Sequence, residues 1–268
     1  MRITDAIILG LLQGATEFLP VSSSGHLALA EHYLRLTGIG LPFDVALHMG
    51  TLTAVLVYFR QDFLRMAGYL INYREGGHAG DLYRRLAFYI VLGTLPAVLF
   101  TVLWGKTIEA ATRAPWAIAA ALAAGGVLLL AAERWGGRLR AMESLSLPDA
   151  LLVGLAQAVA IVPGVSRSGI TITAGLFLGL NRQAAARFSF LLSAPVILGA
   201  GVYHLPAMVR QWEMAGQLGH YLAGFAAAAV AGYLCIAFLI RFVQSSTLAV
   251  FAYYRFLVAA LVLFILGG

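Results

Sequence analysis

Six apolar runs, each about as long as one crossing of a lipid bilayer, limit this chain more than any other feature of its sequence. They cover roughly residues 43–60, 84–104, 115–133, 184–204, 219–240 and 247–266. Water cannot hydrogen-bond the backbone inside a bilayer, so such a segment must bond its own N–H and C=O groups as an α-helix. Hydrophobic residues make up 61% of the chain and charged residues only 11%. We therefore predict an all-α, polytopic membrane protein with six transmembrane helices in a single integral membrane domain.

Two further apolar regions are interrupted by polar turns. Residues 3–37 are broken around 19–24, and residues 149–180 are broken around 163–168. Non-helical backbone at membrane depth is tolerated only where protein or a water-filled cavity covers it. We predict that each region is a re-entrant helical hairpin, in which two short helices enter and leave the membrane on the same side.

The two broken regions are related as an internal repeat. Aligned without a gap at an offset of 144, residues 5–30 match 149–174 at ten of 26 positions. The identical pairs are Asp5/Asp149, Ala6/Ala150, Gly10/Gly154, Leu11/Leu155, Gln13/Gln157, Val21/Val165, Ser22/Ser166, Ser24/Ser168, Gly25/Gly169 and Ala30/Ala174. Each half, roughly 1–140 and 141–268, then contains one hairpin and three spans. Because three is odd, the second half starts on the opposite side of the membrane, and we predict inverted repeats whose hairpins meet near the midplane.

Basic residues are distributed unequally between the two sides of the predicted membrane. The side of the N-terminus has five, namely Arg2, Arg35, Lys106, Arg113 and Arg210. The other side has eleven, namely Arg60, Arg65, Arg74, Arg84, Arg85, Arg134, Arg138, Arg140, Arg182, Arg187 and Arg241. The more basic side faces the cytoplasm, so we predict that both termini lie outside. The net charge of +6 follows from this topology, and we expect no nucleic-acid partner.

A new helix is predicted to begin directly after each polar turn. The residues at these two helix starts are Ser22, Ser23 and Ser24 in the first hairpin and Ser166, Arg167 and Ser168 in the second. Serine is a favoured N-cap, and helix N-termini present free N–H groups that bind anions such as phosphate. Together with the guanidinium of Arg167, two facing helix starts predict a phosphate site. The alternative is that these serines only cap and pack the broken helices.

The repeat is most informative at the positions where its two copies differ. The differing pairs are Glu17/Ile161, Ser23/Arg167 and His26/Ile170. A charge at bilayer depth costs at least about 2.5–3.5 kcal/mol, so Glu17 and Arg167 require an explanation. One explanation is a buried structural ion pair between the two hairpins. The other is a reactive half that faces an anion-binding half, and this one also accounts for His26.

Three segments of the chain resemble one bacterial enzyme family. The segments "QGATEFLPVSSSGH" (13–26) and "PGVSRSGIT" (163–171) resemble the two signature motifs of the undecaprenyl-diphosphate phosphatases, the bacitracin-resistance family. The segment "FDVALHMGTLTAV" (43–55) is also similar. The resemblance implies an enzyme of the bacterial inner membrane that removes the terminal phosphate from undecaprenyl diphosphate, the polyprenyl lipid carrier of cell-wall synthesis, usually with a divalent cation such as Mg²⁺ or Ca²⁺. The site would face the outside.

The resemblance also implies a set of site residues. Carried over by position, they are Gln13, Glu17, Ser22, Ser23, His26, Ser166, Arg167 and Thr171. We add Ser168, from the second helix start, as a substrate-binding residue. Other members of the family have Glu at the position of Gln13, and an amide cannot supply a second carboxylate to a metal. Gln157, at the equivalent position of the other repeat, favours a hydrogen-bonding role for both glutamines.

The chemical roles of these residues remain open at this point. Glu17, on the same helix face as Gln13, would either contact a metal ion or orient His26. Ser23 would attack phosphorus with His26 as its base, or else His26 or an activated water would be the nucleophile. Arg167, with Ser166 and Thr171, would neutralise charge on the transferring phosphate.

Three other polar residues each have two alternative assignments. Asp44 and His48, four positions apart at a helix start, would either support the site or pack at a helix end. Arg255 is expected to be buried or close to the membrane interface, with a carboxylate or carbonyl partner. The sequence leaves open whether two copies form a homodimer.

A transporter is the main alternative to an enzyme. Secondary transporters also combine inverted repeats with broken helices that meet at the midplane. The chain would then be a transporter or flippase for a phosphorylated lipid or anion. Glu17 and His26 favour chemistry, because a carrier needs to bind an anion but needs no nucleophile.

Overall fold

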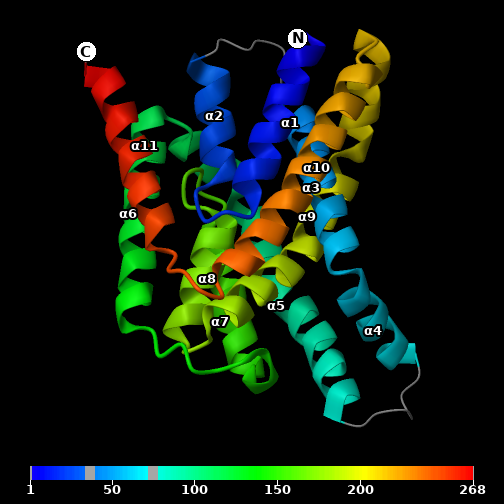
Figure 1. Cartoon of the computed structure of the whole chain (residues 1–268). Coiled ribbons are helices and arrows are strands. Elements are labelled where there is room, and N and C mark those ends of the chain that lie inside the picture. Colours follow the sequence, from blue (N-terminus) through cyan, green and yellow to red (C-terminus); the bar gives the residue numbers. More distant parts are fainter. Residues whose placement is uncertain (1, 34–39, 72–77, 268) are drawn as a thin grey trace.

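The predicted all-α architecture is confirmed. The structure, a computed structural model, describes residues 2–33, 40–71 and 78–267. Its helices there are α1 (Ile3–Glu17), α2 (Ser23–Tyr33), α3 (Leu41–Tyr58), α4 (Arg60–Ile71), α5 (His78–Thr112), α6 (Pro115–Trp135), α7 (Leu147–Val159), α8 (Arg167–Phe177), α9 (Arg182–Ala215), α10 (Leu218–Phe242) and α11 (Ala249–Gly267), with a short 3-10 helix at Met142–Ser144 (Figure 1). Six of them, α3, α5, α6, α9, α10 and α11, are long and apolar enough to cross a membrane, as the six apolar runs predicted. Arg35 and Arg74, counted in the charge asymmetry, lie outside the described residues.

Three helices differ from the sequence prediction. The link 61–83 contains α4, an additional helix that starts directly after α3. Its sequence "RQDFLRMAGYLI" is amphipathic rather than apolar, so hydropathy alone did not reveal this helix. Helix α4 buries Met66, and its Asp62 forms an ion pair with Arg187 of α9. Helices α5 and α9 also extend beyond their apolar runs, and α9 continues through Pro206.

The two broken regions form helical hairpins that approach each other from opposite ends of the molecule. In Figure 1, α1 and α2 extend from the end that holds both termini, α7 and α8 extend from the other end, and the two turns meet in the middle. Side chains connect them there, since Arg167 pairs with Glu17 and the hydroxyl of Ser168 donates to the carbonyl of Leu19 at 3.1 Å. The predicted meeting of the hairpins is confirmed, whereas their re-entrant path through a membrane stays a prediction.

The two turns have the same local structure. Ser22 and Ser166 both have positive φ angles, 77° and 72°, which are uncommon for residues other than glycine. Each serine hydroxyl accepts a hydrogen bond from a glycine N–H three residues later, Gly25 at 3.3 Å and Gly169 at 3.0 Å. The repeat therefore preserves a capped, sharply turned helix start. The division of the chain at 140/141 stays a prediction.

Glycines bring the first helix of each hairpin very close to a long helix. A Cβ atom on Gly10 of α1 would lie against the backbone of Gly224 in α10, and a Cβ on Gly154 of α7 would lie against the backbone of Gly93 in α5. Gly10 and Gly154 are equivalent positions of the repeat, so both halves use the same contact. Small residues permit such close approach between membrane helices, where dispersion contacts replace the hydrophobic effect as the driving force.

We expect Gly154→Ala to lower the thermal unfolding temperature of the purified protein in detergent. The new methyl would meet backbone atoms of Gly93, its Cα at 2.9 Å, so α7 and α5 must separate, at a cost of about 1–3 kcal/mol. Gly199→Ala in α9 is the matched control, because nothing lies within 4 Å of its added Cβ. A Gly154→Ala protein as stable as the Gly199→Ala protein would contradict the close contact.

Candidate active site

Glu17 is the centre of the candidate site. It ends α1, is only 5% exposed, and has partners from four helices. Its Oε1 lies 2.5 Å from a terminal nitrogen of Arg167, and its Oε2 accepts from Gln13 Nε2 at 2.9 Å and from the Ser23 hydroxyl. Nε2 of His48 lies 3.6 Å from Oε2. The structure thus brings together four of the predicted residues and adds His48, for which sequence reasoning had left a helix-end role open.

The hydroxyl of Ser23 is paired with Glu17 and not with His26. Nδ1 of His26 lies 2.7 Å from the carbonyl oxygen of Ser22, and its Nε2 lies 2.9 Å from the hydroxyl of Tyr254. Both ring nitrogens therefore have other partners in this arrangement. The sequence suggested His26 as the base for Ser23, but in the structure the carboxylate of Glu17 is the group bonded to the Ser23 hydroxyl. The suggestion that Glu17 orients His26 is not supported, because both ring nitrogens of His26 have other partners.

Arg167 has one terminal nitrogen on Glu17 and another directed elsewhere. Its NH1 atom is buried and has no hydrogen-bond partner within the described ranges. It begins α8 as Ser23 begins α2, and the first N–H groups of a helix have no acceptor within that helix. Free donors from a guanidinium and from two helix starts are what a phosphate group requires.

The remaining predicted hydroxyls bond mainly to the protein itself. Ser166 caps α8, and its hydroxyl lies 3.3 Å from that of Ser168. Thr171 donates to the carbonyl of Arg167 at 2.7 Å and lies 2.6 Å from the hydroxyl of Ser189. These bonds support the capping interpretation, because they fix the helix start that carries Arg167. Direct binding of substrate by Ser22, Ser166, Ser168 and Thr171 stays a prediction.

Arg255 joins both turns from α11. Its side chain is 1% exposed and donates only to carbonyl groups among the described residues, as the sequence suggested. The acceptors are Pro20 of the first turn at 3.4 Å, Gly164 and Val165 of the second turn at 3.1 and 2.9 Å, and Ala121 and Leu122 of α6 at 3.2 and 2.9 Å. One buried guanidinium therefore fixes the distance between the turns that carry the site.

We expect Arg255→Met to lower both thermal stability and activity. The substitution leaves several buried carbonyls without a donor, and each such group costs about 1–3 kcal/mol. Arg241→Met, at the exposed end of α10, is the matched control and should change neither property strongly. Thermal unfolding in detergent and phosphate release measure the two effects. Parent-like stability of Arg255→Met would show that the turns are held together by other contacts.

A small cavity adjoins the Glu17 cluster. Its volume is about 130 Å³. It is lined by Ser24, Leu27, Ala28, Leu41, Asp44, Val45, His48, Arg113 and Pro163. His48 borders this cavity and also lies beside Glu17, and its Nδ1 is 2.7 Å from the carbonyl of Asp44. The cavity at the start of α3 therefore lies close to the carboxylate of Glu17, with His48 between them.

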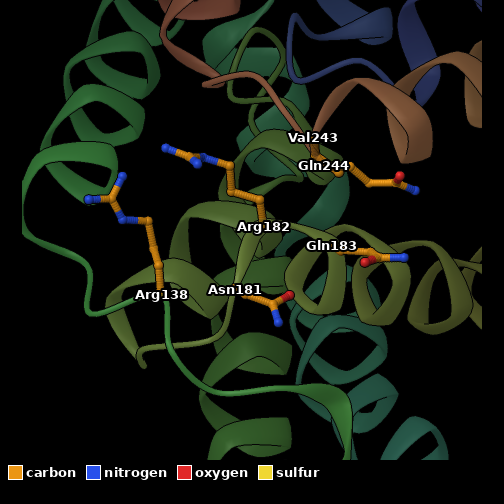
Figure 2. A pocket seen from close by; sticks show the side chains of 6 residues that line it. All are labelled: Arg138, Asn181, Arg182, Gln183, Val243 and Gln244. Carbon is orange, nitrogen blue, oxygen red and sulfur yellow. The ribbon is translucent and has the colours of Figure 1, made fainter.

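A larger, more open cavity of about 520 Å³ lies away from this cluster. It is lined by Arg138, Asn181, Arg182, Gln183, Val243 and Gln244 (Figure 2). None of these is a predicted site residue. Its two arginines both pair with Glu133 of α6, Arg182 at 2.5 Å and Arg138 at 3.3 Å. These ion pairs join the end of α6 to the start of α9, so the arginines have a structural role. Size therefore does not identify the active site in this protein.

The donors around Glu17 suit a hard cation only in part. Among the described residues, no group of three or more His, Cys, Asp or Glu side chains could hold a metal ion. Glu17 supplies one carboxylate. The Oε1 atom of Gln13 beside it is buried and has no hydrogen-bond partner in the part of the chain that the structure describes. This oxygen is a suitable ligand for Mg²⁺ or Ca²⁺, provided that a diphosphate completes the coordination.

Comparison with known proteins gives one consistent family. The sequence profile of the family described as "Bacitracin resistance protein BacA" matches residues 6–261. The chain is 49% identical over 265 residues to the undecaprenyl-diphosphatase of Rubrobacter xylanophilus, a match that covers 98% of the chain and 97% of the relative. It is 48% identical over 265 residues to the undecaprenyl-diphosphatase of Geobacter sulfurreducens, with 98% of both covered. These matches extend through both hairpins.

Proposed function

This chain belongs to the bacitracin resistance protein BacA family, and on that premise we propose that it is an undecaprenyl-diphosphatase. It hydrolyses undecaprenyl diphosphate to undecaprenyl phosphate and inorganic phosphate, and so returns the lipid carrier of cell-wall synthesis to use. The observation that carries the proposal is the cluster of Ser23, Glu17 and Arg167, in which a hydroxyl, its proton acceptor and an anion-binding guanidinium meet at two helix starts.

The geometry supports attack by Ser23 with Glu17 as the base. The Ser23 hydroxyl already donates to Oε2 of Glu17, so its proton passes to the carboxylate as Oγ bonds to the terminal phosphorus. The bond from phosphorus to the bridging oxygen breaks, and undecaprenyl phosphate leaves. Water then attacks the phosphoseryl phosphorus, the proton on Glu17 returns to Ser23 Oγ, and inorganic phosphate is released. His26 is available as a second proton acceptor for that water.

Arg167 stabilises the charge that develops on the transferring phosphoryl group. Its NH1 atom and the N–H groups at the starts of α2 and α8 bind the non-bridging oxygens, which is the electrostatic part of phosphoryl transfer. Glu17 holds the other end of the guanidinium and so fixes its direction. Glu17 and Gln13 Oε1 would hold a divalent cation, which would neutralise part of the charge of the substrate.

Phosphate release from undecaprenyl diphosphate by the purified protein in detergent tests the proposed function. We expect release to be time-dependent and to fall when EDTA is added. A protein that releases no phosphate but carries the lipid or an anion across vesicle membranes would instead be the transporter that the inverted repeat allows. If release is insensitive to EDTA, the divalent cation is no longer part of the proposed mechanism. The mechanism would then depend on Ser23, Glu17 and Arg167 alone.

We further propose that the protein lies in the bacterial inner membrane with its site open to the outside. Both termini lie at the same end of the molecule (Figure 1). The asymmetry of basic residues supports an outer location for this end. Whether the enzyme functions as a homodimer is independent of this assignment.

Cysteine labelling in intact cells tests the orientation, because Cys235 is the chain's single cysteine. After Cys235→Ser, a membrane-impermeant maleimide should label Gly219→Cys, at the exposed start of α10. It should not label Leu139→Cys, which is 92% exposed at the opposite end, until the cells are lysed. The reverse pattern would place both termini in the cytoplasm.

A further inference from the structure

His26 is held by a residue that the sequence did not connect with the site. A backbone carbonyl can only accept a hydrogen bond, so the 2.7 Å contact of Nδ1 with the Ser22 carbonyl places a proton on Nδ1. In the neutral imidazole, Nε2 then carries the lone pair. The hydroxyl of Tyr254 lies 2.9 Å from Nε2 and donates to it. The tautomer of His26 is therefore fixed by two partners, one on its own hairpin and one on the last helix.

Tyr254 also fixes the plane of the imidazole ring. The two rings are nearly parallel, with an interplanar angle of 9° and centroids 5.7 Å apart. The tyrosine belongs to α11, and its neighbour Arg255 bonds to both turns, so the same helix positions the turns and the imidazole. Tyr254 is 41% exposed, whereas Arg255 is buried, so these two neighbours on α11 have different surroundings.

We propose that Tyr254 is a positioning residue for His26. It holds Nε2 as the unprotonated nitrogen, the form in which His26 can accept a proton from the attacking water. The site then contains two separate proton-handling units, Ser23 with Glu17 and His26 with Tyr254. The catalytic consequence rests on the proposed phosphatase function, whereas the hydrogen bond itself does not.

The test compares Tyr254→Phe with Tyr253→Phe. Phenylalanine keeps the stacked ring and removes only the hydroxyl. Tyr253 is the adjacent residue, is 63% exposed, and provides a matched loss of one hydroxyl. Two quantities are measured on purified protein. One is kcat and KM for undecaprenyl diphosphate. The other is the rate at which diethyl pyrocarbonate modifies His26 without substrate, read by peptide mass spectrometry with His204 as the internal reference.

We expect Tyr254→Phe to lower kcat about five- to tenfold, the value of one hydrogen bond, with little change in KM. Its His26 should also be modified several-fold faster, because Nε2 has lost its donor, while His204 keeps its rate. Tyr253→Phe should match the parent in both measurements. The proposal is overturned if Tyr254→Phe leaves the modification rate of His26 unchanged, or if the rate rises while kcat stays at the parent value. An inactive parent would refute the phosphatase function, and the modification rate would still decide whether Tyr254 holds His26.

Discussion

Replacing Glu17 with glutamine is expected to lower phosphate release by about 10³-fold or more, while the protein still binds its diphosphate substrate. Glutamine keeps the size of the side chain and can still bond to Gln13 and Arg167, but it cannot take the proton of Ser23. Base catalysis of this kind contributes about 10²–10⁴-fold to a rate. Single-turnover phosphate release and equilibrium binding of the lipid measure the two effects separately.

Glu133→Gln is the matched control for this variant. Glu133 is also a buried carboxylate that pairs with arginines, Arg182 and Arg138, but it lies beside the large cavity and not at the hairpin turns. Losing one partner of a buried ion pair destabilises a protein, so both variants should unfold at a lower temperature than the parent. Only Glu17→Gln should lose the chemical step. If Glu133→Gln lost it equally, the effect of Glu17 would be structural, and the base would have to be sought elsewhere.

Ser23→Ala is expected to abolish turnover, with a loss of at least about 10³-fold, because the attacking oxygen is removed. In the parent protein, acid quenching during a single turnover should trap phosphate on a peptide that contains Ser23. The reason to choose Ser23 among three consecutive serines is geometric. Its hydroxyl is the one that donates to Glu17, whereas the hydroxyl of Ser22 accepts the N–H of Gly25 and so is committed to the cap.

Ser22→Ala distinguishes the nucleophile from the cap. Loss of an N-cap costs about 0.5–2 kcal/mol, so this variant should be less stable but should still form phosphoserine at Ser23. Phosphate trapped on His26 would make the imidazole the nucleophile. Substantial release by Ser23→Ala without any trapped intermediate would indicate direct attack by water, with Ser23 as an orienting donor.

The spans and the two hairpins were predictable from sequence because a bilayer leaves few alternatives. An apolar run of about 20 residues in a bilayer can only be a helix, and a polar turn within such a run must be covered by protein or line a water-filled cavity. The six runs correspond to α3, α5, α6, α9, α10 and α11. By contrast, α4 was missed, because a helix outside the apolar runs is specified by amphipathic spacing rather than by hydropathy.

The sequence singled out the residues that the structure brings together at the turns, whereas it did not predict how they pair. The repeat marked Glu17, Ser23, His26 and Arg167 as the positions where one copy had acquired polar chemistry. Sequence spacing suggested that Ser23 and His26, three residues apart on one helix, form a pair. The pairing depends instead on what faces each side chain across the hairpin turns. Ser23 bonds to Glu17, six residues earlier, whose other partner Arg167 is 150 residues distant from it, and the partner of His26, Tyr254, is 228 residues distant.

The sequence by itself therefore determined the membrane class, the helical spans, the repeat and the residues able to perform the chemistry, because these follow from hydropathy, periodicity and residue type. Only the tertiary structure decided that the hydroxyl of Ser23 donates to Glu17, that Tyr254 bonds to His26, and that Arg255 joins the two turns. The physical reason is that glycine contacts bring α1 and α7 close to the long helices, and this packing sets where the turns meet. Hydrogen bonds require donor and acceptor within about 3 Å, and only the packed arrangement of distant helices fixes separations so small.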